Sequence, residues 1–284
     1  MHNEIFTTTK EIKNITIALF SDLHFYPEIK KSILDKITTQ IKIRKPDYIA
    51  ITGDILDSSD ITNIEVLKTF LIELSKISKI IVVLGNHDEK KGKMGKWSYE
   101  KNNALVDFLN TQNNIYLLND NTYIDNDKNI CFYGFNLSYH YYEVKDEEYN
   151  TFTKEVNELH TELNPNTYNI TLFHSPINIY KFIKENNNHN LSKSDLILSG
   201  HMHNGALPFI ITHPLNKLFK TSRSLMSPLK TLFPKYAQGR IYKEKADGYV
   251  YEGITKLSNS TRLLHKLDCL FQKNVEFITI KKDS

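Results

Sequence analysis

The chain contains few of the residues that mark disulfide-rich or metal-knuckle proteins. Only two of its 284 residues, Cys131 and Cys269, are cysteines. Two cysteines are too few for a disulfide framework, and their separation excludes a CxxC zinc or redox motif. We therefore expect the protein to work in a reduced, cytosolic setting.

Long apolar runs are also missing. No stretch approaches the ~20 apolar residues that cross a bilayer, and the first fourteen residues have neither the apolar centre nor the basic flank of a signal peptide. These absences argue against an integral membrane protein. We expect a cytoplasmic location, and a peripheral position at the inner face of the membrane stays open.

The chain carries little net charge. Its 36 Lys and Arg residues against 33 Asp and Glu give +3, so overall charge does not favour nucleic acid as a partner. Hydrophobic residues make up 40% and charged residues 24%, as in ordinary globular domains that fold alone. The length is compatible with one large α/β domain or with two.

Short β-branched runs alternate with helical periodicity in the first part of the chain. The pattern predicts strands at 15–20, 48–51 and 80–84, and helices at 29–43, 61–77 and 98–109. This βαβαβα order implies parallel strands with helical crossovers.

The second part of the chain has shorter predicted strands and fewer helices. Strands are expected at 115–118, 122–124, 129–132, 168–173, 196–198, 248–253 and 275–280. Helices are expected at 152–163 and after Pro176, with Ser175 as the N-cap. No repeat or linker divides the chain, so we expect one α/β domain over residues 1–284, built from two facing sheets flanked by helices.

Polar residues follow the predicted strands wherever a strand ends. The blocks are Asp22-Leu-His24, Gly53-Asp54, Gly85-Asn86-His87-Asp88, His174 and Gly200-His201-Met202-His203. Because the carboxyl ends of neighbouring parallel strands open onto one crevice, these side chains are expected to converge. Carboxylates, imidazoles and an amide form a mixed N/O ligand set that suits Mn, Fe or Zn better than Ca or an Fe–S cluster.

The order of these blocks resembles that of the calcineurin-like metallophosphoesterase family: D-x-H, GD, GNH[D/E], a lone H and GH-x-H. Each block alone is a weak signal, but all five in order at strand ends are specific. The resemblance covers residues 15–203. It implies a four-layer αββα sandwich of two mixed sheets, and an enzyme that hydrolyses a phosphate ester or pyrophosphate bond.

The resemblance also implies roles for individual residues around two divalent metal ions. Asp22, His24 and His203 would hold the first ion, Asn86, His174 and His201 the second, and Asp54 would bridge both. A hydroxide between the ions would attack phosphorus. His87 would be the catalytic residue that protonates the leaving oxygen or stabilises the phosphoryl charge.

Three local questions stay open from the residues alone. Asp88 either orients His87 or caps the following turn, and the turn is slightly favoured. Asp57 either supports a metal ligand or starts a surface helix. The aromatic residues Tyr133, Phe135, Tyr139, Tyr141 and Tyr142 either form a substrate wall or pack in the core and loops.

Residues 215–245 combine basic side chains, among them Arg223, with bulky apolar neighbours. Such a segment suits an anionic lipid surface, and the alternative is a solvated loop. The segment resembles one in UDP-2,3-diacylglucosamine hydrolases and YkuE-like phosphoesterases, which implies a phosphorylated small-molecule or lipid substrate, with Arg223 as a substrate-binding residue. A departure follows the last motif, where Asn204 replaces a frequent glycine. The alternatives are a soluble nucleotide or nucleic-acid phosphodiesterase and a metal-binding scaffold without activity.

Overall fold

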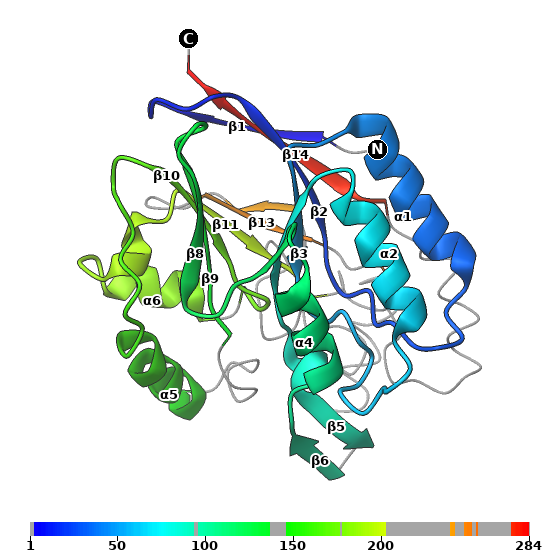
Figure 1. The fold of residues 1–284 in the computed structure, drawn as a ribbon. Helices are drawn as coiled ribbons and strands as arrows, with labels where there is room; N and C mark the ends of the chain where they lie inside the picture. The colour runs from blue at the N-terminus through cyan, green and yellow to red at the C-terminus, as the bar shows by residue number, and fades with distance from the viewer. Residues whose placement is uncertain are drawn as a thin grey trace, which may run out of the picture.

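Two six-stranded sheets lie at the centre of the computed structural model (Figure 1). The structure describes residues 3–93, 96–136, 146–176, 178–202, 239–241, 247–251, 254 and 274–283. Within these residues, none of the helices has the length and apolar character that a bilayer crossing requires. Of the basic segment 215–245, only 239–241 is described, so its predicted role is not addressed by the fold.

The first sheet has the strand order β1-β14-β2-β3-β4-β7. Its strands are β1 (Asn3–Thr8), β14 (Glu276–Lys282), β2 (Ile15–Phe20), β3 (Tyr48–Thr52), β4 (Lys79–Val83) and β7 (Ile115–Leu117). β2, β3, β4 and β7 run parallel, whereas β14 is antiparallel to β2. The strand ends that follow β2, β3 and β4 therefore share one edge of this sheet.

The second sheet has the order β12-β13-β11-β10-β9-β8. Its strands are β12 (Gly239–Ile241), β13 (Asp247–Val250), β11 (Leu196–Ser199), β10 (Tyr168–Leu172), β9 (Ile130–Gly134) and β8 (Asn121–Asp125). The inner four strands are parallel and the two outer strands are antiparallel to their neighbours. A separate hairpin joins β5 (Lys90–Lys93) to β6 (Lys96–Tyr99).

Helices cover both outer faces of the paired sheets. The helices are α1 (Lys31–Arg44), α2 (Glu65–Ser75), α3 (Asn86–Glu89), α4 (Asn103–Thr111), α5 (Asp146–Asn157) and α6 (Ile179–Glu185), with the 3₁₀ helix η2 (Asn190–Lys193). Figure 1 shows α1 and α2 on one side of the sheets and α5 and α6 on the other. The predicted four-layer arrangement of two mixed sheets flanked by helices is confirmed.

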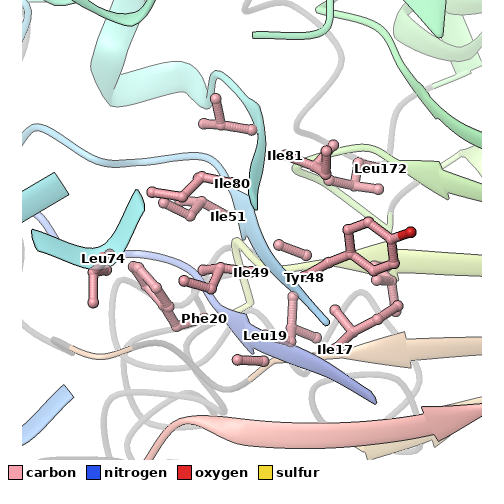
Figure 2. Close-up of a cluster of buried hydrophobic side chains, with 14 of the residues drawn as sticks. Ile17, Leu19, Phe20, Tyr48, Ile49, Ile51, Leu74, Ile80, Ile81 and Leu172 are labelled. Carbon is pink, nitrogen blue, oxygen red and sulfur yellow. The ribbon is translucent and has the colours of Figure 1, made fainter. Parts of the chain in front are cut away.

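Alternate residues of the strands serve two different apolar clusters. In β9, Ile130 and Phe132 join the main core between the sheets, whereas Cys131 and Tyr133 join the cluster under α5 and α6. Figure 2 shows the main core, with Leu74 of α2 and Leu172 of β10 on opposite sides of the first sheet. Burial of both faces explains why the parallel strands read as continuous apolar runs.

Two predicted helix starts are wrong. α4 begins at Asn103 rather than at 98, because residues 96–99 form a strand and the Asn102 side chain accepts a hydrogen bond from Leu105 N at 2.9 Å. α6 begins at Ile179 with Asn178 as its N-cap, so Ser175 does not cap it. Asn178 has a left-handed φ of 69°, a conformation that asparagine tolerates and that local periodicity does not reveal.

The predicted helix 152–163 is displaced, and three regions of strand were not predicted. α5 spans Asp146–Asn157, and Leu163 reaches the same apolar cluster from the loop beyond it, which explains its misleading periodicity. β1, the β5–β6 hairpin and β12 were missed. The only apolar residues of β1 are the adjacent Ile5, which is exposed, and Phe6, which is buried, so its sequence lacks the apolar–polar alternation that identifies a strand.

Candidate metal centre

Asp54 lies at the centre of a cluster of side chains from both sheets. Its Oδ2 is 3.2 Å from His174 Nε2 and 3.6 Å from His24 Nε2. Asp54 follows β3, His24 follows β2 and His174 follows β10, and all three are buried. The common edge of the parallel strands thus places one carboxylate between imidazoles from opposite sheets.

Asp22 and His201 connect the two sheets at the same edge. The backbone N–H of His201 donates to both carboxylate oxygens of Asp22, at 3.2 and 3.1 Å. The imidazole of His201 lies across the ring of His174, with 5.0 Å between ring centroids. The block after β11 is therefore held against the block after β2.

Asn86, the first residue of α3, is adjacent to this cluster in the chain, since the N–H of the next residue, His87, donates to Asp54 Oδ1 at 2.8 Å. Its side chain is 6% exposed, and Oδ1 has no hydrogen-bond partner among the described residues. A buried amide oxygen without a partner costs roughly 1–3 kcal/mol. Coordination of a cation would remove that cost.

The backbone of four candidate ligands is in the left-handed region, with φ of 54° for Asp22, 44° for His24, 50° for Asp54 and 67° for His201. Few non-glycine residues adopt this conformation, although Asp and His do so more readily than most. Each such residue costs of order 1 kcal/mol or more and persists where the surroundings hold it. The strand-end backbone is therefore bent to direct these side chains into one site.

Two glycines permit the close approach of the loops. A Cβ on Gly85 would lie 2.3 Å from Asp54 Oδ1 and 2.9 Å from His174 Nε2. A Cβ on Gly200 would lie 2.0 Å from Ser21 Oγ and 2.5 Å from Asp22 Oδ2. A side chain at either position would occupy space that the candidate ligands need.

Electrostatic interactions within the cluster shift the pKa values of its members. Burial alone would raise the pKa of Asp54, but the imidazoles, led by His174, hold it well below its usual range. Burial lowers the pKa of His174, yet the Asp54 carboxylate outweighs this effect and raises it to about 9. A divalent cation at the same atoms would displace the imidazole proton, because both occupy the nitrogen lone pair.

His87 differs from the other imidazoles. Its Nδ1 is 2.7 Å from the Asp57 carbonyl oxygen, which can only accept, so Nδ1 carries the hydrogen and Nε2 is directed elsewhere. Burial lowers the pKa of His87 to about 4, although the Asp54 charge opposes the shift. The His87 ring meets His24 edge-on, with 4.6 Å between centroids.

The open alternatives for Asp57 and Asp88 are resolved by their contacts. Asp57 Oδ1 lies 3.3 Å from His24 Nδ1, and no helix starts near Asp57, since α2 begins at Glu65. Asp88 is 1% exposed, and its carboxylate accepts from the backbone N–H groups of Leu56 and Gly85, each at 2.8 Å. Asp88 therefore ties together the loop at Leu56 and the turn that precedes Asp88 at Gly85, a role that neither alternative described.

A family model supplies the identification. The model of the calcineurin-like phosphoesterases matches residues 15–205, which is more than half of the chain. The chain belongs to the calcineurin-like phosphoesterase family. This family depends on a dinuclear metal centre, and its model covers every strand-end block described above.

Two similar proteins are both named as metallophosphoesterases, without a substrate. An uncharacterized metallophosphoesterase of Campylobacter jejuni is 26% identical over 212 residues, covering 73% of this chain and 49% of that protein. Another, of Helicobacter pylori, is 26% identical over 240 residues, covering 84% of this chain and 55% of that protein. The chain thus spans about half the length of these two relatives.

Among solved structures, a dimetal phosphatase from Danio rerio is similar to the chain. It has a TM-score of 0.46 and 12% identity, and the match covers 86% of this chain and 89% of that one.

The calcineurin-like site fits two metal ions by its donor atoms. Asp22, His24 and Asp54 form one group whose ligand atoms lie within 4.8 Å of one another, and Asp54, His174 and His201 form a second. The two groups share Asp54, and the buried Asn86 Oδ1 adds a further oxygen. A third group consists of His24, His87 and Asp57. These residues lie close together because Asp57 contacts both imidazoles, His24 through its carboxylate and His87 through its carbonyl oxygen.

Some predicted residues lie outside the part that the structure describes. These are the metal ligand His203, the substrate-binding residue Arg223 and three residues of the aromatic cluster, Tyr139, Tyr141 and Tyr142, whose roles stay predictions. Tyr133 and Phe135 are buried in the cluster under α5 and α6, so the packing alternative holds for these two aromatic residues. The other described histidines are ordinary: His160 is exposed and His189 caps η2.

Sequence reasoning missed Asn102, which organises the surroundings of the calcineurin-like site. This buried residue donates from its amide to the carbonyl oxygens of Ser59 and Ile61, at 2.9 and 2.7 Å, in the loop beyond Asp57. The available signal was an asparagine three residues before the apolar Leu105, which is typical of a helix N-cap.

Proposed function

We propose that this chain is a metal-dependent hydrolase that cleaves a phosphate ester or pyrophosphate bond. The observation that carries the proposal is the convergence of side chains from the ends of β2, β10 and β11 on Asp54, which follows β3. Family membership supports the same reaction class. A structural protein has no need for six buried or half-buried ligand-type residues at one edge, four of them with left-handed backbone and a fifth, Asn86, directly after Gly85.

The ligand assignments are part of the proposal. Asp22 and His24, with the predicted His203, would hold one ion, and Asn86, His174 and His201 would hold the other, with Asp54 between them. The imidazole-rich donor set suits Mn, Fe or Zn. When bound, two such ions neutralise phosphate charge and lower the pKa of water between them, which makes a nucleophile available at neutral pH.

His87 is the candidate to act on the leaving group. The Asp57 carbonyl fixes the ring through Nδ1, so we assign Nε2 as the ring atom that acts on the leaving group. With a pKa of about 4, His87 is neutral at pH 7, and the neutral ring with its hydrogen on Nδ1 can accept a hydrogen bond at Nε2. Protonation of the leaving oxygen by His87 therefore requires the negative charge of a bound phosphate to raise its pKa.

Hydrolysis of an aryl phosphomonoester and an aryl phosphodiester with Mn²⁺ tests the proposal. We expect turnover by the wild type, loss of both metal and turnover in Asp54→Ala, and retained metal with turnover reduced about 100-fold in His87→Ala. Asp107→Ala, which removes an exposed carboxylate of α4, is the matched control and should behave as wild type. Elemental analysis of each purified variant gives the metal content.

A wild type that retains two metal ions yet is inert toward every ester and anhydride in a broad panel would contradict the enzyme proposal. It would favour the alternative of a metal-binding scaffold. A His87→Ala variant that loses metal would contradict the assignment of His87 as a residue that does not bind metal.

A lipid-linked or membrane-proximal substrate is the finer part of the proposal. Its support is the basic and apolar composition of residues 215–245, with Arg223 as a candidate contact to substrate phosphate. Co-sedimentation with phosphatidylglycerol vesicles at low and high salt tests it. Absence of binding at low salt would favour the alternative of a phosphodiesterase acting on nucleotides or nucleic acid in solution.

A further inference from the structure

A pocket of about 300 Å³ opens beside the candidate metal centre without including any of its proposed ligands. One wall is formed by residues 59–62, in the loop beyond β3. The other wall is formed by residues 100–104, which lead into the first turn of α4. Figure 1 shows α4 above the β5–β6 hairpin. The volume is at the lower end of the range for small-molecule sites, which is ~300–1,000 Å³.

Both walls begin at segments that carry the metal centre. Asp57 holds His87 through its carbonyl and contacts His24 with its side chain. Ser59 is two residues further on, so its Cα lies within about 7.6 Å of the Asp57 Cα. On the other wall, Asn102 N donates to the carbonyl oxygen of Asp88, the residue after His87. The pocket therefore adjoins the side of the centre where His87 lies.

The two walls are held at a defined separation by Asn102. Its amide donates across the gap to the carbonyls of Ser59 and Ile61, while its Oδ1 accepts from Leu105 N at 2.9 Å. All of these contacts involve a side chain that is 6% exposed. The shape of the pocket is thus fixed before any ligand binds.

The polar groups around the pocket favour a ligand that donates hydrogen bonds. Two acidic residues, Asp60 and Glu100, line it, and the Nζ of the one lysine among the lining residues, Lys101, is 3.4 Å from the Glu89 carboxylate outside the pocket. The Ser59 hydroxyl, on a residue 8% exposed, has no hydrogen-bond partner among the described residues. Acidic surroundings repel phosphate and attract alcohol hydroxyls, which donate to carboxylates.

The lining residues also argue against a nucleoside. None of them is aromatic, so a base would have no ring on which to stack. We propose that the pocket binds the hydroxyl-rich alcohol of the substrate, a glycerol or sugar unit, while the phosphate lies at the metal centre. This inference rests on the proposed phosphoesterase function and adds the class of leaving group.

Matched esters test the inference on the complete chain loaded with Mn²⁺. Glycerol 3-phosphate and propyl phosphate, or their methyl diesters if the enzyme cleaves only diesters, differ in the two hydroxyls alone. We expect kcat/KM to be about tenfold higher for the glycerol ester, as for one hydrogen bond to a charged group. The double variant Asp60→Ala/Glu100→Ala, which removes both acceptor groups, should remove most of this preference.

A second variant closes the pocket without altering its charge. Ala104→Leu adds volume at an exposed lining position of α4 and should lower kcat/KM for the glycerol ester only. Asn110→Leu adds the same side chain at an exposed position of α4 that does not line the pocket, and should change neither substrate. Equal effects on both esters would show that the variants disturb the centre rather than a leaving-group site.

Further outcomes separate this inference from the proposed function. If the wild type hydrolyses the two esters with equal kcat/KM, the alcohol site is overturned while the proposed hydrolase function is retained. If kcat/KM for 3-aminopropyl phosphate exceeds that for glycerol 3-phosphate, the pocket is a cation site instead. If the wild type hydrolyses nothing, saturation-transfer NMR with glucose still tests the pocket. Signals that weaken in Ala104→Leu support it, and absent signals overturn it.

Discussion

The close approach of Gly200 to the block after β2 leads to the sharpest prediction. In Gly200→Ala, the new Cβ would lie 2.0 Å from Ser21 Oγ. Cβ atoms in proteins rarely approach another heavy atom more closely than 3.0 Å, so this contact is too short by 1.0 Å. Ser21 Oγ cannot turn away freely, because it donates to the carbonyls of Thr52 and Gly53 at 2.9 and 3.2 Å. The strain must therefore move Asp22 away from His201, whose backbone N–H donates to the Asp22 carboxylate.

Two quantities should change in Gly200→Ala. Overpacking of this kind costs about 1–3 kcal/mol of unfolding free energy. Displacement of two candidate ligands should weaken Mn²⁺ binding about 10- to 100-fold, as when the support of a metal ligand is lost. Urea unfolding in the presence of chelator measures the first quantity, and calorimetric titration with Mn²⁺ measures the second.

Gly134→Ala is the matched control, because its Cβ would lie 2.5 Å from Leu118 Cβ and 2.6 Å from Val83 Cγ1, both apolar. It should lose similar stability but keep its affinity for Mn²⁺. The reasoning fails if both variants lose affinity equally, or if Gly200→Ala is destabilised and still binds Mn²⁺ like the wild type. Adding Ser21→Gly to Gly200→Ala removes two of the three close contacts and should restore part of the affinity.

Two further predictions concern single carboxylates. Asp57→Ala removes the group 3.3 Å from His24 Nδ1 and should weaken Mn²⁺ binding about tenfold by calorimetry; unchanged affinity would contradict a supporting role. Asp125→Asn should lower the free energy of unfolding by about 1–3 kcal/mol at pH 7, because Asp125 accepts a hydrogen bond from the Tyr48 hydroxyl at 2.6 Å. The control variant Asp127→Asn, at an exposed position, should change the free energy of unfolding by less than about 0.5 kcal/mol. Burial alone would raise the pKa of Asp125, but its hydrogen bonds and nearby cations hold it below the ordinary 3.8. This contribution is therefore present above about pH 4 and is lost as the pH falls through the lower folded pKa, so urea unfolding at pH 7 and pH 3 should show the difference from wild type shrinking. A difference that stays constant with pH would refute the assigned interaction.

The positions of the candidate ligands were accessible from the amino-acid sequence. Each is a polar residue that lies within a few positions after a continuous apolar run, and both features are local. Parallel strands with helical crossovers then bring the ends of β2, β3 and β4 to one edge without further information. Five ordered blocks were enough to identify the family, since chance does not place all of them at strand ends.

Only the tertiary structure decided how the site is supported. The carbonyl of Asp57 fixes His87, the carboxylate of Asp88 joins two loops, and Asn102 sets the width of the neighbouring pocket. These contacts join residues about 30 to 43 positions apart, and their partners are backbone groups that carry no residue-specific signal. The pairing of β1 with β14 is still more distant, from Asn3 to Phe277.

Local periodicity thus determined which residues end each strand and, through them, the chemistry available to this chain. Packing of the two sheets decided which backbone groups meet those residues, because hydrogen bonds to the main chain depend on spatial proximity alone. The left-handed turns at Asp22, His24, Asp54 and His201 likewise depend on both the local sequence and the tertiary packing. Their residue types permit the conformation, and contacts with neighbouring strand ends hold it, as in the hydrogen bonds from Asp22 N to the Gly53 carbonyl and from His24 N to the Asp54 carbonyl.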